Sequence, residues 1–371
     1  LRSRIDSDSS TKADTGAIAI LSQQGSVDII GSTISTTNFA SGIAGDVVIT
    51  AQDNVTFRNS TVFSRGNQGR ILIGKSQFLD LAPKSIKLDN SALTTRNDVD
   101  ATGRIDAGDI SLIAQDSIEL TNGSFITSST DREGLAGLIY LQTDGGDVVL
   151  SGGSAIETNV KRNGFSPDSE TPFAGGVFNS LLGRTDQKIV GSIGISTGNL
   201  LLTDGSYLDA STEGRGNAGA VIVSASNSVT LQNGGVIFSR VEPGGSGNSG
   251  GIIIGAGSVL IEGANTGLTT STLGDGSAGL ILVAARDRIA LNRGGAIFSQ
   301  VTENNTQDAG GIVLVTDNDA LTLRNGSRIS VNNNGSGEAG LIFISSLATF
   351  LDRDSVISAT TRSGRGGDIE I

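Results

Sequence analysis

The sequence predicts an all-β fold: a parallel β-helix in which about 12 coils of about 30 residues stack into one solenoid. Three observations predict it. A glycine-led unit recurs along the chain, each unit holds three short runs of alternating apolar residues, and helical spacing is absent. Without crossover helices, short parallel strands find partners in the equivalent strands of neighbouring repeats. The expected product is a single-stranded solenoid with three short strands in each coil.

The repeat is marked by the glycine that opens the first run of each unit, here called the opening glycine. From Gly191 onward, successive opening glycines are 28, 31, 29, 31, 30 and 27 residues apart. A period near 30 that tolerates small changes in length is typical of solenoids. The opening glycines are Gly16, Gly45, Gly69, Gly108, Gly137, Gly191, Gly219, Gly250, Gly279, Gly310, Gly340 and Gly367.

Inside a unit the apolar residues recur with a period of two. The unit opened by Gly219 has runs at 221–223, 229–231 and 236–238. Such runs, rich in β-branched residues and bounded by Gly, Asn and Asp, predict strands. Polar residues predict the turns between strands one and two, eight residues after an opening glycine: Asp53, Asp116, Asn227 and Asp287. Pairs such as Asn233-Gly234 come before the third run, where glycine allows a positive φ.

Two long steps interrupt the repeat, so we expect residues 1–371 to form one continuous solenoid with loops inserted at about 160–188 and at about 76–104. The larger insertion carries Phe165, Phe173 and Phe178. These three are the candidate ligand-contact residues. The favoured interpretation is that they pin the loop to the rod, because exposed apolar clusters are unusual on soluble monomers.

Composition excludes several function classes. The chain has no His and no Cys, so a Ser-His-Asp triad, a cysteine nucleophile and a His- or Cys-ligated zinc site are ruled out, and no cofactor is expected. With 26 basic and 38 acidic residues the net charge is −12, which disfavours nucleic acid as a partner. No apolar run reaches the roughly 18–20 residues of a membrane-spanning helix. We therefore expect a protein that is not an enzyme.

Carboxylate chemistry is the alternative that composition leaves open. A glycosidase needs two carboxyl groups about 5–9 Å apart across one cleft, and calcium needs six or more oxygens. Asp144-Gly-Gly-Asp147 is the nearest approach to a calcium loop. Most of the paired aspartates fall where turns are expected, so a backbone role is favoured. The pairs are Asp98 and Asp100, Asp106 and Asp109, Asp144 and Asp147, Asp317 and Asp319, and Asp352 and Asp354.

Two further expectations concern side-chain placement. The Ser/Thr tracts 127–130 and 269–272 could form a flat ladder of the ice-binding kind, but we expect solvated turns because the tracts are not repeated in every coil. Phenylalanines that fall in strand runs are expected in the core: Phe57, Phe63, Phe125, Phe238, Phe298, Phe343 and Phe350.

Several strings resemble the repeat region of filamentous-haemagglutinin-type exoproteins of two-partner secretion. They are 214–219 (GRGNAG), 226–231 (SNSVTL) and 233–235 (NGG). The segments 173–178 (FAGGVF) and 193–200 (IGISTGNL) are similar to cyanobacterial-type members. The resemblance covers essentially the whole chain and is strongest from Gly137 to Ile371.

This resemblance implies a right-handed β-helix that is exported through an outer-membrane β-barrel partner and then secreted or held at the cell surface. The function it implies is that of the non-catalytic shaft of an adhesin, whose ligand would be a glycan or protein of a host or neighbouring cell. Because the sequence begins at Leu1, we expect an export signal upstream. Alternatives are a polysaccharide-active β-helix enzyme and a glycan-binding module built on the 160–188 insertion.

Overall fold

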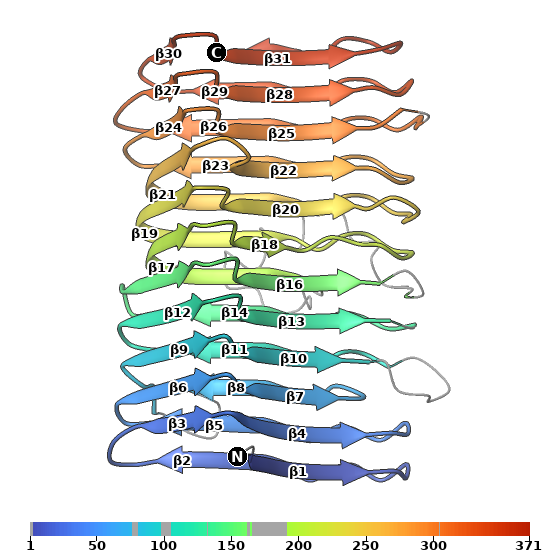
Figure 1. The fold of residues 1–371 in the computed structure, drawn as a ribbon. Helices are drawn as coiled ribbons and strands as arrows, with labels where there is room; N and C mark the ends of the chain where they lie inside the picture. The colour runs from blue at the N-terminus through green and yellow to red at the C-terminus, as the bar shows by residue number, and fades with distance from the viewer. Residues whose placement is uncertain are drawn as a thin grey trace.

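A computed structural model describes residues 3–75, 81–97, 105–131, 133–161, 164, 191–303 and 305–371. These residues form strands, turns and loops without a helix, and the coils are stacked one on another along a rod with the two termini at opposite ends (Figure 1). All strand pairs are parallel. The predicted parallel β-helix is confirmed, with about 11 turns, because twelve opening glycines enclose eleven repeats.

The first strands of the coils form one side of the rod. They are β2 (Ile18–Ser22), β5 (Val47–Ala51), β8 (Ile71–Gly74), β11 (Ile110–Ile113), β14 (Ile139–Gln142), β23 (Ile281–Ala285), β26 (Ile312–Thr316), β29 (Ile342–Ser345) and β32 (Ile369–Glu370). The second strands are β3 (Val27–Ile30), β6 (Asn54–Arg58), β9 (Ser85–Asp89), β12 (Ser117–Thr121), β15 (Asp147–Leu150), β24 (Ile289–Asn292), β27 (Leu321–Leu323) and β30 (Thr349–Leu351).

In three coils the first and second strands are continuous: β17 (Ile193–Leu202), β19 (Val221–Gln232) and β21 (Ile252–Glu262). Asn227 therefore lies inside β19, where the register shifts between Ala225 and Ser228, and the tight turn predicted at this residue is wrong. A local irregularity turns the chain there without ending the strand.

The third strands make a separate 12-stranded sheet, here called the third sheet. They are β1 (Ser3–Ser9), β4 (Ser32–Asn38), β7 (Thr61–Arg65), β10 (Ala92–Arg96), β13 (Phe125–Thr130), β16 (Ala155–Val160), β18 (Tyr207–Asp209), β20 (Val236–Val241), β22 (Gly267–Thr272), β25 (Ala296–Val301), β28 (Arg328–Asn333) and β31 (Val356–Thr361).

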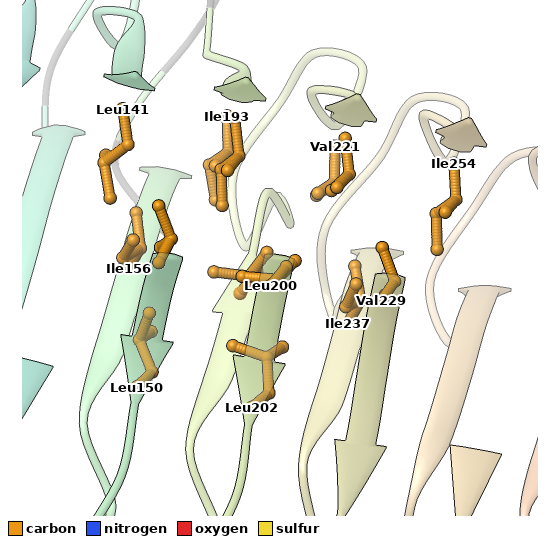
Figure 2. Close-up of a cluster of buried hydrophobic side chains, with 14 of the residues drawn as sticks. Leu141, Leu150, Ile156, Ile193, Leu200, Leu202, Val221, Val229, Ile237 and Ile254 are labelled. Carbon is orange, nitrogen blue, oxygen red and sulfur yellow. The ribbon is translucent and has the colours of Figure 1, made fainter. Parts of the chain in front are cut away.

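The core consists of aliphatic side chains stacked in register from coil to coil. Figure 2 shows Ile193 of a first strand, Leu200 of a second and Ile156 of a third pointing into the same interior. In the third sheet the inward column runs from Ile126 through Ile156 and Leu208 to Ile237. These four side chains are fully buried, and burial of each contributes about 1.5–3 kcal/mol.

The opening glycines are needed because successive coils approach closely at this corner. Each stands two residues before a first strand. A Cβ on Gly279 would lie 1.4 Å from the carbonyl oxygen of Gly250, and a Cβ on Gly219 would lie 1.5 Å from that of Gly191. Only a residue without a side chain fits against the backbone of the preceding coil.

A column of buried Ser and Thr hydroxyls binds the same glycines. Thr95 Oγ1 donates to the carbonyl of Gly108 at 2.6 Å, and Thr270 Oγ1 donates to that of Gly279 at 2.8 Å. Ser128 likewise donates to Gly108 at 3.0 Å. The prediction that 127–130 and 269–272 are solvated turns is therefore wrong. Both tracts are strand residues and mostly buried, and the hydroxyls of Ser128 and Thr270 bind backbone carbonyls inside the rod.

Most of the phenylalanines that were expected in the core lie on outward positions. Phe57 alone of the seven is fully buried, in the inward column of the second strands. Phe125 is 44% and Phe350 55% exposed. The others are half-buried on the outer surface, namely Phe63, Phe238, Phe298 and Phe343. The core prediction failed for these six because a run that is apolar at adjacent positions does not reveal which position points inward.

The turns before the third strands adopt left-handed backbone angles. Asn122 has φ 56° and Gly123 has φ 70°, and the pair Asn233-Gly234 has φ 49° and 80°. Asparagine tolerates this conformation better than other non-glycine residues. The predicted turn is confirmed, and the asparagine shares the positive φ with the glycine.

Candidate functional site

A mixed group of charged and aromatic side chains lies on the outer surface of the third sheet. It comprises Glu157 on β16, Tyr207 and Asp209 on β18, Phe238 and Arg240 on β20, and Glu242 just after β20, and is called the Asp209 cluster here. Register brings these residues together, since Glu157 pairs with Asp209 and Asp209 pairs with Phe238 on successive strands. Their side chains point away from the core because Leu208, between Tyr207 and Asp209, points into it.

Hydrogen bonds and ion pairs connect the cluster. Tyr207 Oη donates to Glu157 Oε1 at 2.5 Å. The backbone N–H of Ser211 donates to Asp209 Oδ1 at 3.0 Å, and the Ser211 hydroxyl donates to the same oxygen. Arg240 pairs with Glu242 at 2.8 Å, and its guanidinium lies 3.9 Å above the Phe238 ring centroid. Arg240 therefore holds one carboxylate and stacks on one aromatic face at once.

The electrostatic surroundings shift two pKa values in this cluster. Burial raises the pKa of Asp209 to about 6, and the negative charges of Glu157 and Glu242 also raise it against the opposing effects of Ser211 and Arg240. Burial also raises the pKa of the Tyr207 phenol, helped by its hydrogen bond to Glu157. Tyr207 therefore keeps its proton at neutral pH and donates a hydrogen bond to Glu157, whereas Asp209 gains or loses its proton in mildly acidic solution.

The arrangement places two carboxyl groups at paired positions on neighbouring strands. Adjacent strands are about 4.8 Å apart, so side chains at paired outward positions lie next to one another. Glu157 is held by a phenol and Asp209 by a serine. Such a pair can accept hydrogen bonds from the hydroxyls of a sugar or another polyol.

The aspartate pairs that were candidates for carboxylate chemistry have structural roles instead. Asp106 Oδ1 accepts the backbone N–H of Leu135 at 3.0 Å, and Asp109 Oδ1 accepts that of Leu138 at 2.8 Å, so both bind the next coil. Asp147 accepts the side-chain amide of Asn199 at 2.8 Å. The remaining members lie between strands, in bends or irregular segments: Asp144, Asp317, Asp319, Asp352 and Asp354.

Several expected site residues cannot be placed. Asp98 and Asp100 lie outside the described residues, as do Phe165, Phe173 and Phe178. Within the described part of the chain, no group of three or more His, Cys, Asp or Glu side chains is arranged to hold a metal ion.

Sequence reasoning missed the Asp209 cluster because Glu157 and Asp209 are far apart in the chain and the 160–188 insertion separates them. An alignment of the repeat units would have shown the cluster. At the position that Glu157 and Asp209 occupy in their third strands, other coils carry uncharged residues such as Thr127, Thr269 and Phe298.

Comparison of the chain with protein-family models, with curated proteins and with solved structures gave no match. In the described ranges, no helix is long and apolar enough to cross a membrane.

Proposed function

We propose that this chain is the non-catalytic structural shaft of a secreted or surface-displayed, adhesin-like exoprotein. The observation that supports it is the continuity of the ladders: aliphatic core, buried hydroxyls and opening glycines repeat from coil to coil along the rod. About 11 turns at about 4.8 Å each form a rod roughly 50–55 Å long. A rod built this way holds apart whatever is attached to its two ends.

The resemblance to filamentous-haemagglutinin-type repeats supports the finer part of this proposal. It accounts for a rod composed of Gly, Asn, Ser and aliphatic residues, and for a role outside the cell that needs no disulfide. On this proposal an outer-membrane β-barrel partner exports the chain, and the rod presents an adhesive region to a glycan or protein on a host or neighbouring cell.

Surface labelling tests the location. Antibodies against the purified chain are applied to intact and to permeabilised cells that produce it, and the intact cells are then treated with protease. Labelling of intact cells that is lost after protease treatment supports display, whereas labelling confined to permeabilised cells contradicts it. For adhesion, beads coated with the chain should bind target cells more than beads coated with an unrelated protein of similar net charge.

A second candidate function is cleavage of a polysaccharide, favoured by the Glu157–Asp209 pair and the raised pKa of Asp209. The test is release of reducing ends or unsaturated products from a panel of neutral and acidic glycans. An enzyme would lose turnover in Asp209→Asn and Glu157→Gln but not in Asp144→Asn, whose side chain lies in an exposed turn. Absence of any turnover by the wild-type chain favours the shaft.

A further inference from the structure

The outer surface of five successive first strands, those of β19, β21, β23, β26 and β29, carries no charge. It is formed by the segments 220–224, 251–255, 280–284, 311–315 and 341–345, which pair in register as neighbouring strands, and it is called the neutral face here. None of these segments contains Asp, Glu, Lys or Arg, in a chain with 64 such residues. Charged side chains elsewhere reach the surface of every other side of the rod, such as Lys87, Glu119 and Arg240.

An apolar column runs along the middle of this face. Ile222, Ile253, Leu282, Val313 and Phe343 occupy equivalent outward positions on five successive strands. Ile253 is only 8% exposed although it points outward, since Ile222 and Leu282 pack against it from the coils on either side.

A glycine interrupts the neighbouring outward column of the neutral face. Gly311 has no side chain, and a Cβ placed on it would lie 3.3 Å from Leu280 Cδ1. The next member of this column, Leu341, is 42% exposed. Two such faces can pack as sheets do in a sandwich, about 10 Å apart.

We propose that the neutral face docks a second copy of this chain, so that two rods associate side by side. Each copy carries a net charge of −12, and like-charged rods repel one another through any charged surface. The neutral face is where two copies can come together without burying unpaired charge.

Flanking charges select an antiparallel arrangement of the two rods. Arg286 follows β23 and Asp317 follows β26, both exposed at the same edge of the face on successive coils. With a two-fold axis across the rods between β23 and β26, Arg286 of each copy lies opposite Asp317 of the other, and Leu282 lies opposite Val313. Parallel rods would not bring these two edges together.

The size of the face sets the strength expected. With the axis between β23 and β26, the four strands β21, β23, β26 and β29 of each copy oppose one another. Four strands of about five residues cover roughly 19 Å by 13–16 Å, or about 250–300 Å² on each copy, which is below the size of stable interfaces. The association is therefore weak and reversible for the isolated chain, and becomes effective where many rods are held close together on one surface.

Sedimentation equilibrium of the whole chain across micromolar to millimolar concentrations tests the proposal. The wild type is expected to dimerise, and Leu282→Asp is expected to weaken the dimer at least about tenfold. Leu260→Asp is the matched control, because Leu260 is an outward, half-buried leucine on the second-strand side of β21 and lies off the neutral face. Circular dichroism establishes that both variants keep the β fold.

A charge exchange provides a test that leaves the core untouched. Arg286→Asp should weaken the dimer, and combining it with Asp317→Arg should restore it. A wild-type chain that stays monomeric throughout, equal effects of Leu282→Asp and Leu260→Asp, or failure of the double exchange to restore association would each overturn the proposed antiparallel dimer.

Discussion

Replacing Gly279 by alanine probes the close contact between coils that the opening glycines allow. The added Cβ would lie 1.4 Å from the Gly250 carbonyl oxygen, whereas real Cβ atoms essentially never approach below 3.0 Å. The two backbones must therefore separate by at least 1.6 Å, the difference of these distances. No flexible side chain can move aside, since the obstacle is a carbonyl of the preceding coil.

The expected cost follows from what this separation breaks. The Gly279 carbonyl accepts from Thr270 at 2.8 Å and Ser299 at 3.2 Å, and the next residue's carbonyl accepts from Ile252 N–H at 3.0 Å. Overpacking costs about 1–3 kcal/mol and each weakened hydrogen bond about 0.5–1.5 kcal/mol. Gly279→Ala should therefore lower the free energy of unfolding by about 3–5 kcal/mol.

Gly255→Ala is the matched control. A Cβ there meets nothing within 4 Å, its φ is not positive, and its neighbours in the column are Ser224 and Ala284. This change should be neutral, or stabilising by up to about 1 kcal/mol through the unfolded state.

Urea unfolding followed by circular dichroism measures both variants. Hydrogen exchange resolved by peptide shows whether protection is lost around residues 250–300, because a solenoid can open coil by coil. If Gly279→Ala falls within 0.5 kcal/mol of Gly255→Ala and exchange near both sites is unchanged, the steric account of the opening glycines is wrong.

Three further predictions concern other contacts. Thr95→Val removes the hydrogen bond from the buried Thr95 hydroxyl to the Gly108 carbonyl, which still accepts the bond from Ser128. Urea unfolding should show that the free energy of unfolding falls by about 1 kcal/mol, whereas Thr94→Val, at an outward position, should change it little. Asp209 has a folded pKa of about 6, above its ordinary 3.8, so the fold binds the proton more tightly than the unfolded chain does. Wild-type stability should therefore fall relative to Asp209→Asn between about pH 4 and pH 6, by up to about 3 kcal/mol, and level off above; parallel curves would refute the shift. Arg293 holds φ 52°, a turn conformation that asparagine tolerates better. Arg293→Asn should raise the urea midpoint, with a gain of about 0.5–1 kcal/mol, whereas Arg288→Asn, which has an ordinary φ, should not.

Sequence reasoning missed the Asp209 cluster and the neutral face for the same reason. Glu157 and Asp209 become neighbours only through the register of β16 and β18, across an insertion of unequal length. The neutral face becomes visible only when the outward residues of five successive coils are aligned. If the assumed register is wrong by one residue, the alignment contains core residues such as Ile281 and Ile312 instead.

The direction of each side chain was likewise decided by tertiary structure. Ile237 and Phe238 are both apolar and adjacent, and the isoleucine is the one that points inward. The hydroxyls of Thr95 and Thr270 look like surface groups in the sequence. They are buried because the partners that satisfy them, the carbonyls of Gly108 and Gly279, arrive from a different corner of the coil.

The sequence by itself determined the architecture. The period of the repeat and the turns before the third strands depend on residues whose backbone requirements are local. An opening glycine such as Gly279 and a left-handed pair such as Asn233-Gly234 mark positions that few other residues can occupy. The outer surface carries no such constraint, because almost any side chain fits on the outside of a strand. Which outward residues meet, at the Asp209 cluster and along the neutral face, was decided only when the coils stacked in register.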